Sequence, residues 1–112
     1  LSGRSAADCR SVGRRSSQKA VLTSYITEYE KNFDEQASTF GGHAYDAYIV
    51  LKAAIEEAGT DRAALRDAIE GISGLAGTGG VFTFSADDHN GLDIDSFEMI
   101  TVKAGKFVPL AQ

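Results

Sequence analysis

The residue types that could perform acid–base or nucleophilic chemistry lie in two short segments. Ser85, Asp87 and His89 are the side chains of a hydrolytic triad, but they crowd a single predicted turn that has no nucleophile elbow and no oxyanion hole. His43 and Asp46 could form an acid–base pair, yet a polar face on the first turn of a predicted helix explains them more simply. The sequence therefore predicts no catalytic residues, and we expect a protein that is not an enzyme. A small hydrolase that uses Ser85 and His89 stays as an alternative.

Two further segments resemble ion-binding loops without meeting their requirements. The acid-rich segment 87–95 has the look of a calcium loop, but with Gly91 as its sixth position the first and twelfth are Ala86 and Phe97, where carboxylates are needed. The glycines of segment 74–80 follow a predicted helix and precede a predicted strand, whereas phosphate loops lie between a strand and a helix. A single cysteine, Cys9, excludes a thiolate cluster and an intrachain disulfide. We expect no metal site and no cofactor, and we interpret 74–80 as a flexible connector.

One aromatic residue lies where a small ligand could use it. Phe40 is predicted to lie in a loop just ahead of a helix start, where the backbone amides of Gly41 to Tyr45 have no intrahelical partners. An aromatic wall beside free amides suits a small ligand with an apolar side and a carboxylate. From the residues alone, Phe40 as an ordinary core side chain stays an open alternative.

The strongest predicted element is the helix that follows. From Ala44 to Ala58 there is no proline or glycine, and apolar residues recur at steps of three and four. Gly59 then supplies a left-handed stop. Half of the inward positions are alanine, which allows close approach to a neighbouring element. Apolar residues lie on one side and charged residues on the other, the two groups being Ala47, Val50, Leu51, Ala54, Ile55 and Ala58 against Asp46, Lys52, Glu56 and Glu57.

Weaker signals place the remaining elements. A stripe from Leu22 to Phe33 predicts a first helix over about 20–34. Asp61 is a candidate N-cap for a third helix that ends at Gly71, with Asp67 and Glu70 on its wet side. The last elements are a strand over 81–85, a turn over 85–91, and a hairpin of 97–102 with 107–110 whose first strand is apolar on both faces.

The length and the net charge limit the number of domains and the class of partner. A chain of 112 residues forms one domain or less. Its net charge of -5 combines +4 over residues 1–20 with -9 over the rest, and an acidic body argues against a nucleic-acid partner. Residues 1–19 have no apolar period, and we interpret them as a tail or a remnant of the expression vector, with a basic arm for nucleic acid as the alternative. No apolar run approaches the length of a membrane span, and the pattern of a signal peptide is absent.

Several motifs together resemble a known family. They are Phe40-Gly-Gly-His-Ala-Tyr-Asp-Ala with the alanine-rich helix, Thr60-Asp-Arg-Ala-Ala-Leu-Arg-Asp-Ala-Ile-Glu-Gly, Gly77-Thr-Gly-Gly-Val-Phe-Thr-Phe-Ser and Asp88-His-Asn-Gly-Leu-Asp. In combination they closely resemble the C-terminal part of branched-chain amino-acid-binding proteins, the extracytoplasmic receptors of ABC importers. The match runs from about Lys19 to Leu110. Residues 20–112 would accordingly be the C-terminal segment of an α/β class I periplasmic-binding fold, here three helices, a strand and a C-terminal hairpin, while residues 1–18 match nothing in the family.

The resemblance implies a two-lobed parent protein that closes on its ligand and delivers it to a membrane permease. In that family the aromatic at the position of Phe40 lines the ligand pocket, and Gly41, Gly42 and His43 would lie at the cleft or beside it. The ligand would be a branched-chain or other small amino acid, and the parent would be periplasmic. A ligand-sensing regulatory domain of the same fold is the first alternative. Because most strands of both lobes would be missing, we expect the chain to form homo-oligomers through its uncovered apolar faces.

Overall fold

The computed structural model describes residues 6–110, and their side chains from Ser17 on. Within this part of the chain, helices come first and two small antiparallel sheets follow. The elements in chain order are α1 (Ala6–Phe33), α2 (Thr39–Ala58), α3 (Arg62–Gly71), β1 (Ser73–Ala76), β2 (Val81–Thr83), the 3-10 helix η1 (Ile94–Ser96), β3 (Ile100–Lys103) and β4 (Lys106–Pro109).

The first helix is much longer than its apolar stripe predicts. It begins at Ala6 instead of near Ala20, so the boundary expected after residue 19 falls inside a continuous helix. The extension contains no proline, and its alanine and arginine residues are good helix formers, so helical backbone there needs no apolar face. The expectations for residues 1–5 and for the Cys9 side chain lie outside the described residues.

The second helix also begins earlier than expected, at Thr39 instead of Ala44. The reason is a cap that the sequence analysis did not use. The side-chain oxygen of Ser38 accepts a hydrogen bond from the amide of Gly41 at 3.2 Å, and its carbonyl accepts one from Gly42 at 3.0 Å. Phe40 therefore lies in the first turn of α2 and not in a loop, and the amides of Gly41 and Gly42 are not free.

The junctions on either side of α3 follow the sequence closely. Gly59 ends α2 with a positive φ of 73°, and its amide donates to the carbonyl of Ile55 at 2.9 Å. The carboxylate of Asp61 then accepts from the amides of Ala63 and Ala64 at 3.1 and 3.0 Å, as its predicted role as N-cap requires. These two signals set the sharp reversal by which α3 packs back against α2.

The glycine-rich segment is a hairpin and not the flexible connector that we expected. Residues Ser73–Ala76 form β1, which pairs antiparallel with β2. The pairing register shifts between Ser73 and Leu75, and Gly74 occupies this bulge with a φ of 76°. Such a strand has almost no sequence signature, because it is four residues long and half of it is serine and glycine.

The last hairpin has the predicted strands and turn but a different pattern of faces. Its first strand begins at Ile100 and not at Phe97, and within β3 the apolar residues Ile100 and Val102 share one face while Thr101 and Lys103 share the other. The prediction of two apolar faces was therefore wrong. Even the apolar face lacks cover, since Ile100 and Val102 are 56% and 59% exposed.

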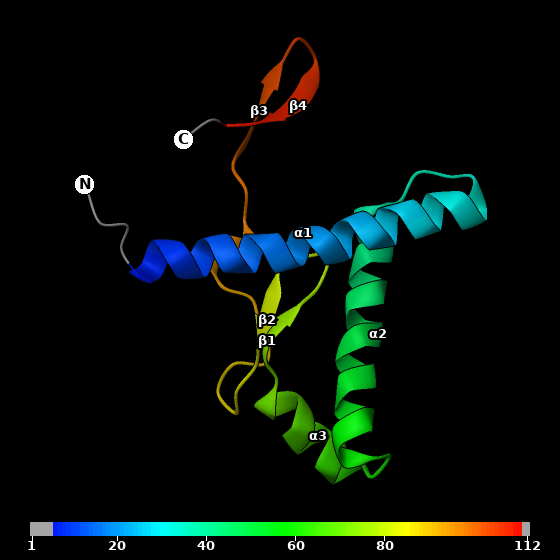
Figure 1. The fold of residues 1–112 in the computed structure, drawn as a ribbon, viewed down its shortest axis with the longest axis vertical. Helices are drawn as coiled ribbons and strands as arrows, with labels where there is room; N and C mark the ends of the chain where they lie inside the picture. The colour runs from blue at the N-terminus through cyan, green and yellow to red at the C-terminus, as the bar shows by residue number, and fades with distance from the viewer. Residues whose placement is uncertain (1–5, 111–112) are drawn as a thin grey trace.

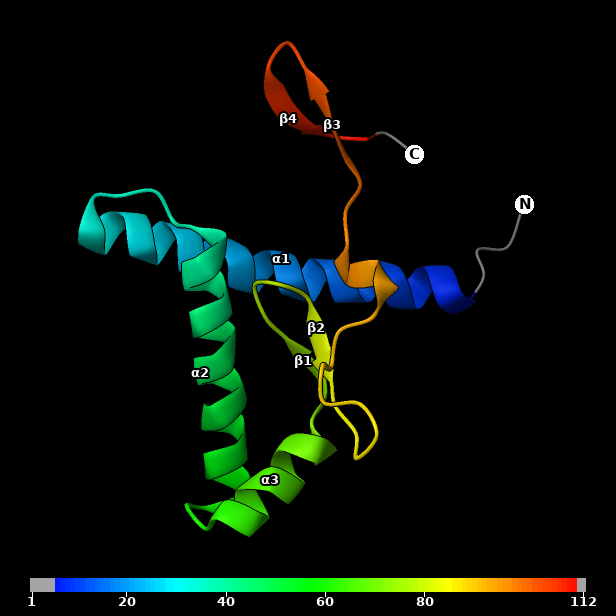
Figure 2. The same cartoon turned by 180° about the vertical axis from the view of Figure 1, so that it is seen from behind.

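The arrangement of the elements is open. In Figure 1 and from behind in Figure 2, α2 descends from one part of α1, α3 turns back from its lower end, and β1 and β2 lie between α1 and α3. The hairpin of β3 and β4 stands on the other side of α1. The radius of gyration is 16.6 Å, whereas a compact domain of this length has about 13 Å. None of the described helices is both long and apolar enough to cross a membrane.

The buried core is correspondingly small. Its apolar members are Ala54, Ala68, Ile72 and Phe82, which join α2, α3 and the first hairpin. Many more large apolar side chains are exposed, namely Phe33, Phe40, Tyr48, Leu51, Ile55, Ile94, Phe97, Met99, Ile100, Val102, Phe107 and Leu110. The helices and strands are therefore formed, but much of their apolar surface contacts no other part of the described residues.

Candidate functional site

The four residues selected from the sequence form the first turn of α2, where their side chains face different ways. Phe40 is 85% exposed and projects from the helix, so it does not belong to the core of the described residues. Gly41 and Gly42 pack inward: a Cβ at Gly41 would collide with the Tyr25 hydroxyl, and one at Gly42 would lie 2.8 Å from Oγ1 of Thr78. His43 is exposed and lies beside Gly79. This turn thus combines an outward aromatic with two glycines that bring its backbone close to α1 and the first hairpin.

An aromatic cluster holds α1 against this turn. The rings of Tyr25 and Tyr45 lie 5.2 Å apart, and Tyr25 also contacts Tyr29 at 5.8 Å, with Phe33 beyond it. Tilted ring pairs at such distances contribute about 0.5–1.5 kcal/mol beyond their buried area. The stripe predicted on the first helix is therefore used to fix the start of α2.

Asp46 is the polar residue that the sequence analysis misplaced. It was expected on the wet side of α2, but it is 3% exposed. Its two carboxylate oxygens accept hydrogen bonds from the backbone amides of Thr78 and Gly79, at 2.5 and 2.8 Å. A charged acceptor that takes two backbone donors in a buried setting makes strong hydrogen bonds. Asp46 therefore pins the turn of the first hairpin to the side of α2, and it is a structural carboxylate instead of half of an acid–base pair.

A hollow of about 160 Å³ lies between the start of α2, the anchored turn and α1. Leu22, Tyr25 and Ile26 form its apolar side, and Gly42 and His43 line it from α2. Pockets that enclose a small molecule usually measure about 300–1,000 Å³. The hollow alone could surround only a part of such a ligand, and Phe40 lies outside it.

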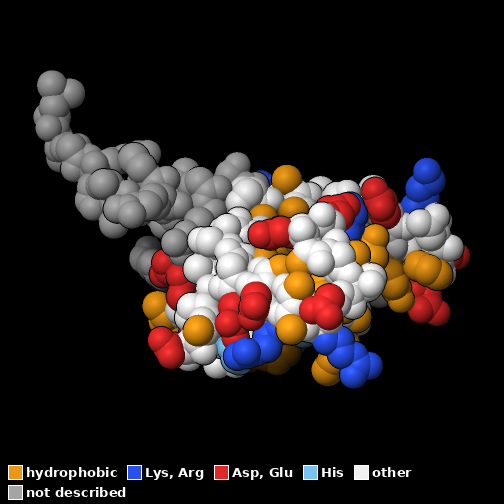
Figure 3. All heavy atoms as spheres, turned by 90° about the horizontal axis from the view of Figure 1, so that it is seen from below, with side chains coloured by type: hydrophobic (Ala, Val, Ile, Leu, Met, Phe, Trp, Pro, Cys, Tyr) orange, Lys and Arg blue, Asp and Glu red, His pale blue; other side chains and the backbone are white. Residues whose placement is uncertain are grey.

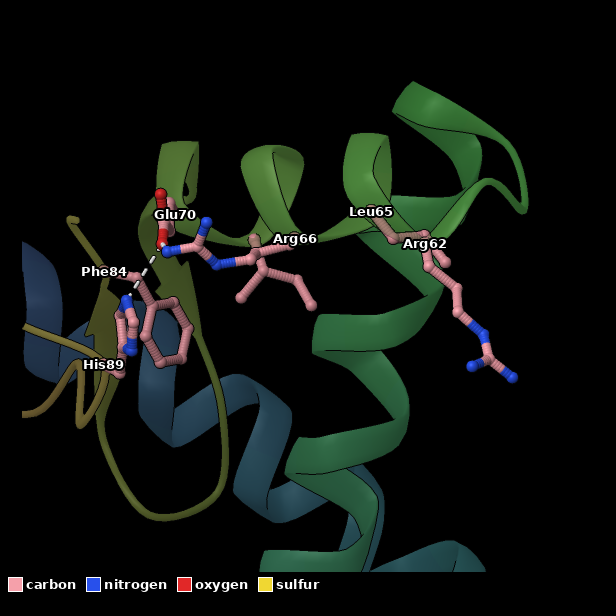
Figure 4. A pocket seen from close by; sticks show the side chains of 7 residues that line it. Arg62, Leu65, Arg66, Glu70, Phe84 and His89 are labelled. Carbon is pink, nitrogen blue, oxygen red and sulfur yellow. Dashed lines mark hydrogen bonds and ion pairs between the residues drawn. The ribbon is translucent and has the colours of Figure 1, made fainter.

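A second cluster lies at the end of α3 (Figure 4). One carboxylate oxygen of Glu70 contacts Nη2 of Arg66 at 2.8 Å and Nε2 of His89 at 2.9 Å. Glu70, which was expected on the wet side of α3, has a side chain only 17% exposed because the turn that carries His89 packs beside it. The contact connects α3 to the segment after β2.

The residues considered for catalysis and for calcium build a turn instead. The hydroxyl of Ser85 accepts hydrogen bonds from the amides of Asp87 and Asp88, at 3.3 and 3.0 Å, and His89 contacts Glu70. Asp88 in turn accepts from the amide of Asn90 at 2.9 Å. The structure does not assemble the triad of Ser85, Asp87 and His89. In the part of the chain that the structure describes, no three His, Cys, Asp or Glu side chains converge to hold a metal ion.

Solved structures contain a similar arrangement. A protein of Rhodopseudomonas palustris strain CGA009 is 31% identical with a TM-score of 0.72, and an extracellular ligand-binding receptor from the same species is 34% identical with a TM-score of 0.69. Each match covers 85% of this chain. The leucine-binding protein LivK of Thermotoga maritima is 24% identical over 81% of this chain, with a TM-score of 0.58, and supports the fold alone. The chain has the fold of a part of a periplasmic-binding protein.

The shared region is only a part of those proteins. This chain covers 29% of the length of the two Rhodopseudomonas palustris proteins and 25% of the Thermotoga maritima protein. The α/β class I periplasmic-binding fold that the motifs predicted is thereby confirmed, with β1 as an added strand. The sequence matches no protein-family model and no curated protein.

Proposed function

We propose that this chain forms part of an extracytoplasmic solute receptor that captures a small amphipathic solute between two lobes. Its similarity to an extracellular ligand-binding receptor supports this role. The solute would be a branched-chain or other small amino acid, and a membrane permease of an ABC importer would receive it. The receptor performs no chemical step, so no residue is assigned to catalysis.

The observation that carries the proposal is the exposure of Phe40. Apolar side chains of this size are normally withdrawn from water, and burying one contributes about 1.5–3 kcal/mol. Phe97 and Phe107 are also more than three-quarters exposed, at 77% and 78%. Phe40 differs from them because it is 85% exposed on a helical turn whose backbone is fixed by the Ser38 cap and by Tyr25. A rigid, outward aromatic is suited to close over the apolar part of a solute. Gly41, Gly42 and His43 would border the same cleft.

A segment exchange tests this role with a known probe. Residues 20–110 replace the matched segment of the Thermotoga maritima leucine-binding protein, and leucine binding is measured by calorimetry. We expect the hybrid to bind leucine, and Phe40→Ala to weaken binding by about tenfold or more, since a buried phenylalanine contributes more than 1.4 kcal/mol. Leu51→Ala, a change at an exposed apolar residue further along α2, is the matched control and should leave the affinity unchanged. A folded hybrid that binds leucine equally well with and without Phe40 would reject the proposed site.

The 112-residue chain alone should behave differently from such a hybrid. Its hollow beside α2 is about 160 Å³, and the proposal assigns most polar contacts of the ligand to parts of the receptor that this chain does not contain. We therefore expect no saturable heat when leucine or valine is titrated into the isolated chain. Saturable binding in that titration would show that these residues hold a complete site.

A further inference from the structure

Asn90 and Gly91 form a chemically labile pair in the turn that joins β2 to η1. Asparagine is a thermolabile residue, because the backbone nitrogen of the next residue can attack its side-chain amide. A glycine in that next position has no β-carbon to obstruct the approach. The only other asparagine of the chain, Asn32, precedes Phe33. Asn90 is therefore the asparagine at which this reaction meets less steric obstruction.

The two asparagines also differ in their surroundings. Asn90 is exposed, and within the described residues no hydrogen bond engages its side-chain amide. Asn32 lies near the end of α1, where each backbone amide donates to the carbonyl four residues earlier. The nitrogen that would attack Asn32, that of Phe33, is therefore held by the helix. The structure thus favours Asn90 over Asn32 independently of the glycine.

The native turn restrains the attacking nitrogen through one side chain. The amide of Gly91 donates to Oδ1 of Asp88 at 3.3 Å, a long hydrogen bond, while the amide of Asn90 donates to the same oxygen at 2.9 Å. The carbonyl of Gly91 accepts from the amide of Thr83 at 2.8 Å. Among the described residues, only the Asp88 contact engages the attacking nitrogen itself. That restraint is weak, so the nitrogen can be released without unfolding the rest of the turn.

We propose that Asn90 is a site of spontaneous modification, at which asparagine is converted to aspartate and isoaspartate, and that the hydrogen bond to Asp88 limits the rate. The Gly91 nitrogen gives its proton to a base in the solvent, and its electron pair forms a bond to Cγ of Asn90. The bond between Cγ and Nδ2 breaks, and Nδ2 leaves as ammonia after taking a proton from water. The product is a cyclic succinimide.

Water then opens the succinimide ring at one of its two carbonyl carbons. Opening at Cγ gives aspartate and keeps the original main chain. Opening at the backbone carbonyl carbon gives isoaspartate, in which the main chain passes through Cβ and Cγ and is one atom longer. Both products add a carboxylate at an exposed position. Figure 3, seen from below, shows acidic side chains at the surface of this protein, and the new carboxylate would be solvated in the same way.

The isoaspartate product does not fit the native turn. A Cβ at Gly91 would already lie 2.5 Å from the ring of Phe84, so the turn has no room for a longer main chain. The residue before Asn90 is His89, whose Nε2 contacts Glu70 of α3 at 2.9 Å (Figure 4). We expect isoaspartate to break this contact and so to loosen α3 from the turn. The proposal does not depend on the receptor function.

Mass spectrometry of the ageing protein tests the modification. The purified chain is kept in mildly alkaline buffer and digested with trypsin at intervals. The tryptic peptides 32–52 and 67–103 each contain one asparagine. We expect the mass gain of deamidation to accumulate at least about tenfold faster in 67–103, because a helical hydrogen bond protects Asn32. Protein digested without incubation gives the background, and Asn90→Ser should abolish the gain in 67–103.

Two matched variants test the role of Asp88. Asp88→Ala removes the acceptor of the Gly91 amide and should accelerate the conversion by about two- to tenfold, the rate equivalent of one hydrogen bond. Asp87→Ala removes a neighbouring exposed charge but no hydrogen bond of Gly91, and should leave the rate nearly unchanged. A synthetic peptide of residues 86–93 has no folded turn and should convert faster than the protein. Far-UV circular dichroism checks that both variants keep their helices.

Thermal unfolding tests the consequence for the turn. Incubated wild type should unfold at a lower temperature than fresh wild type, while incubated Asn90→Ser should unfold like its fresh form. If the incubated and fresh wild type unfold alike after conversion, the turn tolerates isoaspartate and the expected loosening is wrong.

Three results of the mass measurements would overturn the proposal. A folded chain that gains no mass in 67–103 while the peptide is converted has no modification site at Asn90. Equal rates in 67–103 and 32–52 would mean that neither the glycine nor the turn favours Asn90. Equal acceleration by Asp87→Ala and Asp88→Ala would assign control of the rate to local charge instead of the hydrogen bond to Gly91.

Discussion

The two hairpins of this chain differ in both the regularity of their strand pairing and the burial of their apolar side chains, and the more regular hairpin is the less buried one. The β1–β2 hairpin is irregular, with a bulge at Gly74, yet its turn is held by the buried carboxylate of Asp46 and Phe82 enters the core. The β3–β4 hairpin pairs without a bulge, but Ile100, Val102 and Phe107 remain exposed. Regular pairing therefore does not by itself bring a hairpin into the core, and a contact from a distant residue decides whether the hairpin belongs to it.

Removing the anchor of the first hairpin should give the largest effect. Asp46→Ala leaves the buried amide of Thr78 and the partly buried amide of Gly79 without acceptors, and each such loss costs about 1–3 kcal/mol, so we expect about 2–6 kcal/mol of destabilisation. Urea unfolding followed by far-UV circular dichroism measures it. Asp67→Ala removes an exposed acid of α3 and should change stability by less than about 0.5 kcal/mol. Equal effects of the two substitutions would mean that the anchor contributes nothing.

Crowding the same junction should have an intermediate effect. Gly42→Ala brings a methyl group to 2.8 Å from Oγ1 of Thr78, a stiff β-branched side chain, and overpacking of this kind costs about 1–3 kcal/mol. Adding Thr78→Ala removes the colliding atom and should restore most of the lost stability. Gly71→Ala is the control, because a Cβ there has no neighbour within 4 Å. Thermal unfolding of the four proteins gives the comparison, and a double variant no more stable than Gly42→Ala would contradict it.

Improving the turn of the second hairpin should have the smallest effect. Ala104 and Gly105 both have positive φ, 51° and 73°, in a two-residue turn where asparagine is favoured at the first position. Ala104→Asn should stabilise the β3–β4 hairpin by up to about 1 kcal/mol, because asparagine tolerates a left-handed conformation that costs most other residues about 1–2 kcal/mol. Backbone chemical shifts of residues 100–109 report this change. Ala86→Asn, at another exposed alanine, is the control and should leave those shifts unaltered. If Ala104→Asn also leaves them unaltered, the turn does not limit the pairing of β3 with β4.

What the sequence predicted well is what neighbouring residues decide. The stop at Gly59, the cap at Asp61 and the turn before Lys106 each depend on a few adjacent residues, and all are present in the structure. The start of α2 was misplaced by five residues because glycines at 41 and 42 suggest a loop. They are instead required for close contact with Tyr25 and Thr78, which no local pattern shows.

In the candidate site, too, local motifs could be predicted from the sequence and long-range contacts could not. Phe40 could be chosen from its motif, and its exposure fits the choice, but its role with Gly41, Gly42 and His43 stays a prediction. Asp46 could not be assigned, because its acceptor role depends on amides more than thirty residues away. A short glycine-rich turn has backbone amides without local acceptors. Such a turn indicates that a carboxylate elsewhere in the chain could accept hydrogen bonds from them, as Asp46 does.

The aromatic cluster between α1 and α2 determines what spectroscopy of this protein can detect. The chain has no tryptophan, and its four tyrosines are Tyr25, Tyr29, Tyr45 and Tyr48, all on these two helices. Tyrosine emission therefore originates from the junction between α1 and α2. A melting curve recorded by tyrosine fluorescence follows the separation of α1 from α2 and carries no direct signal from either sheet.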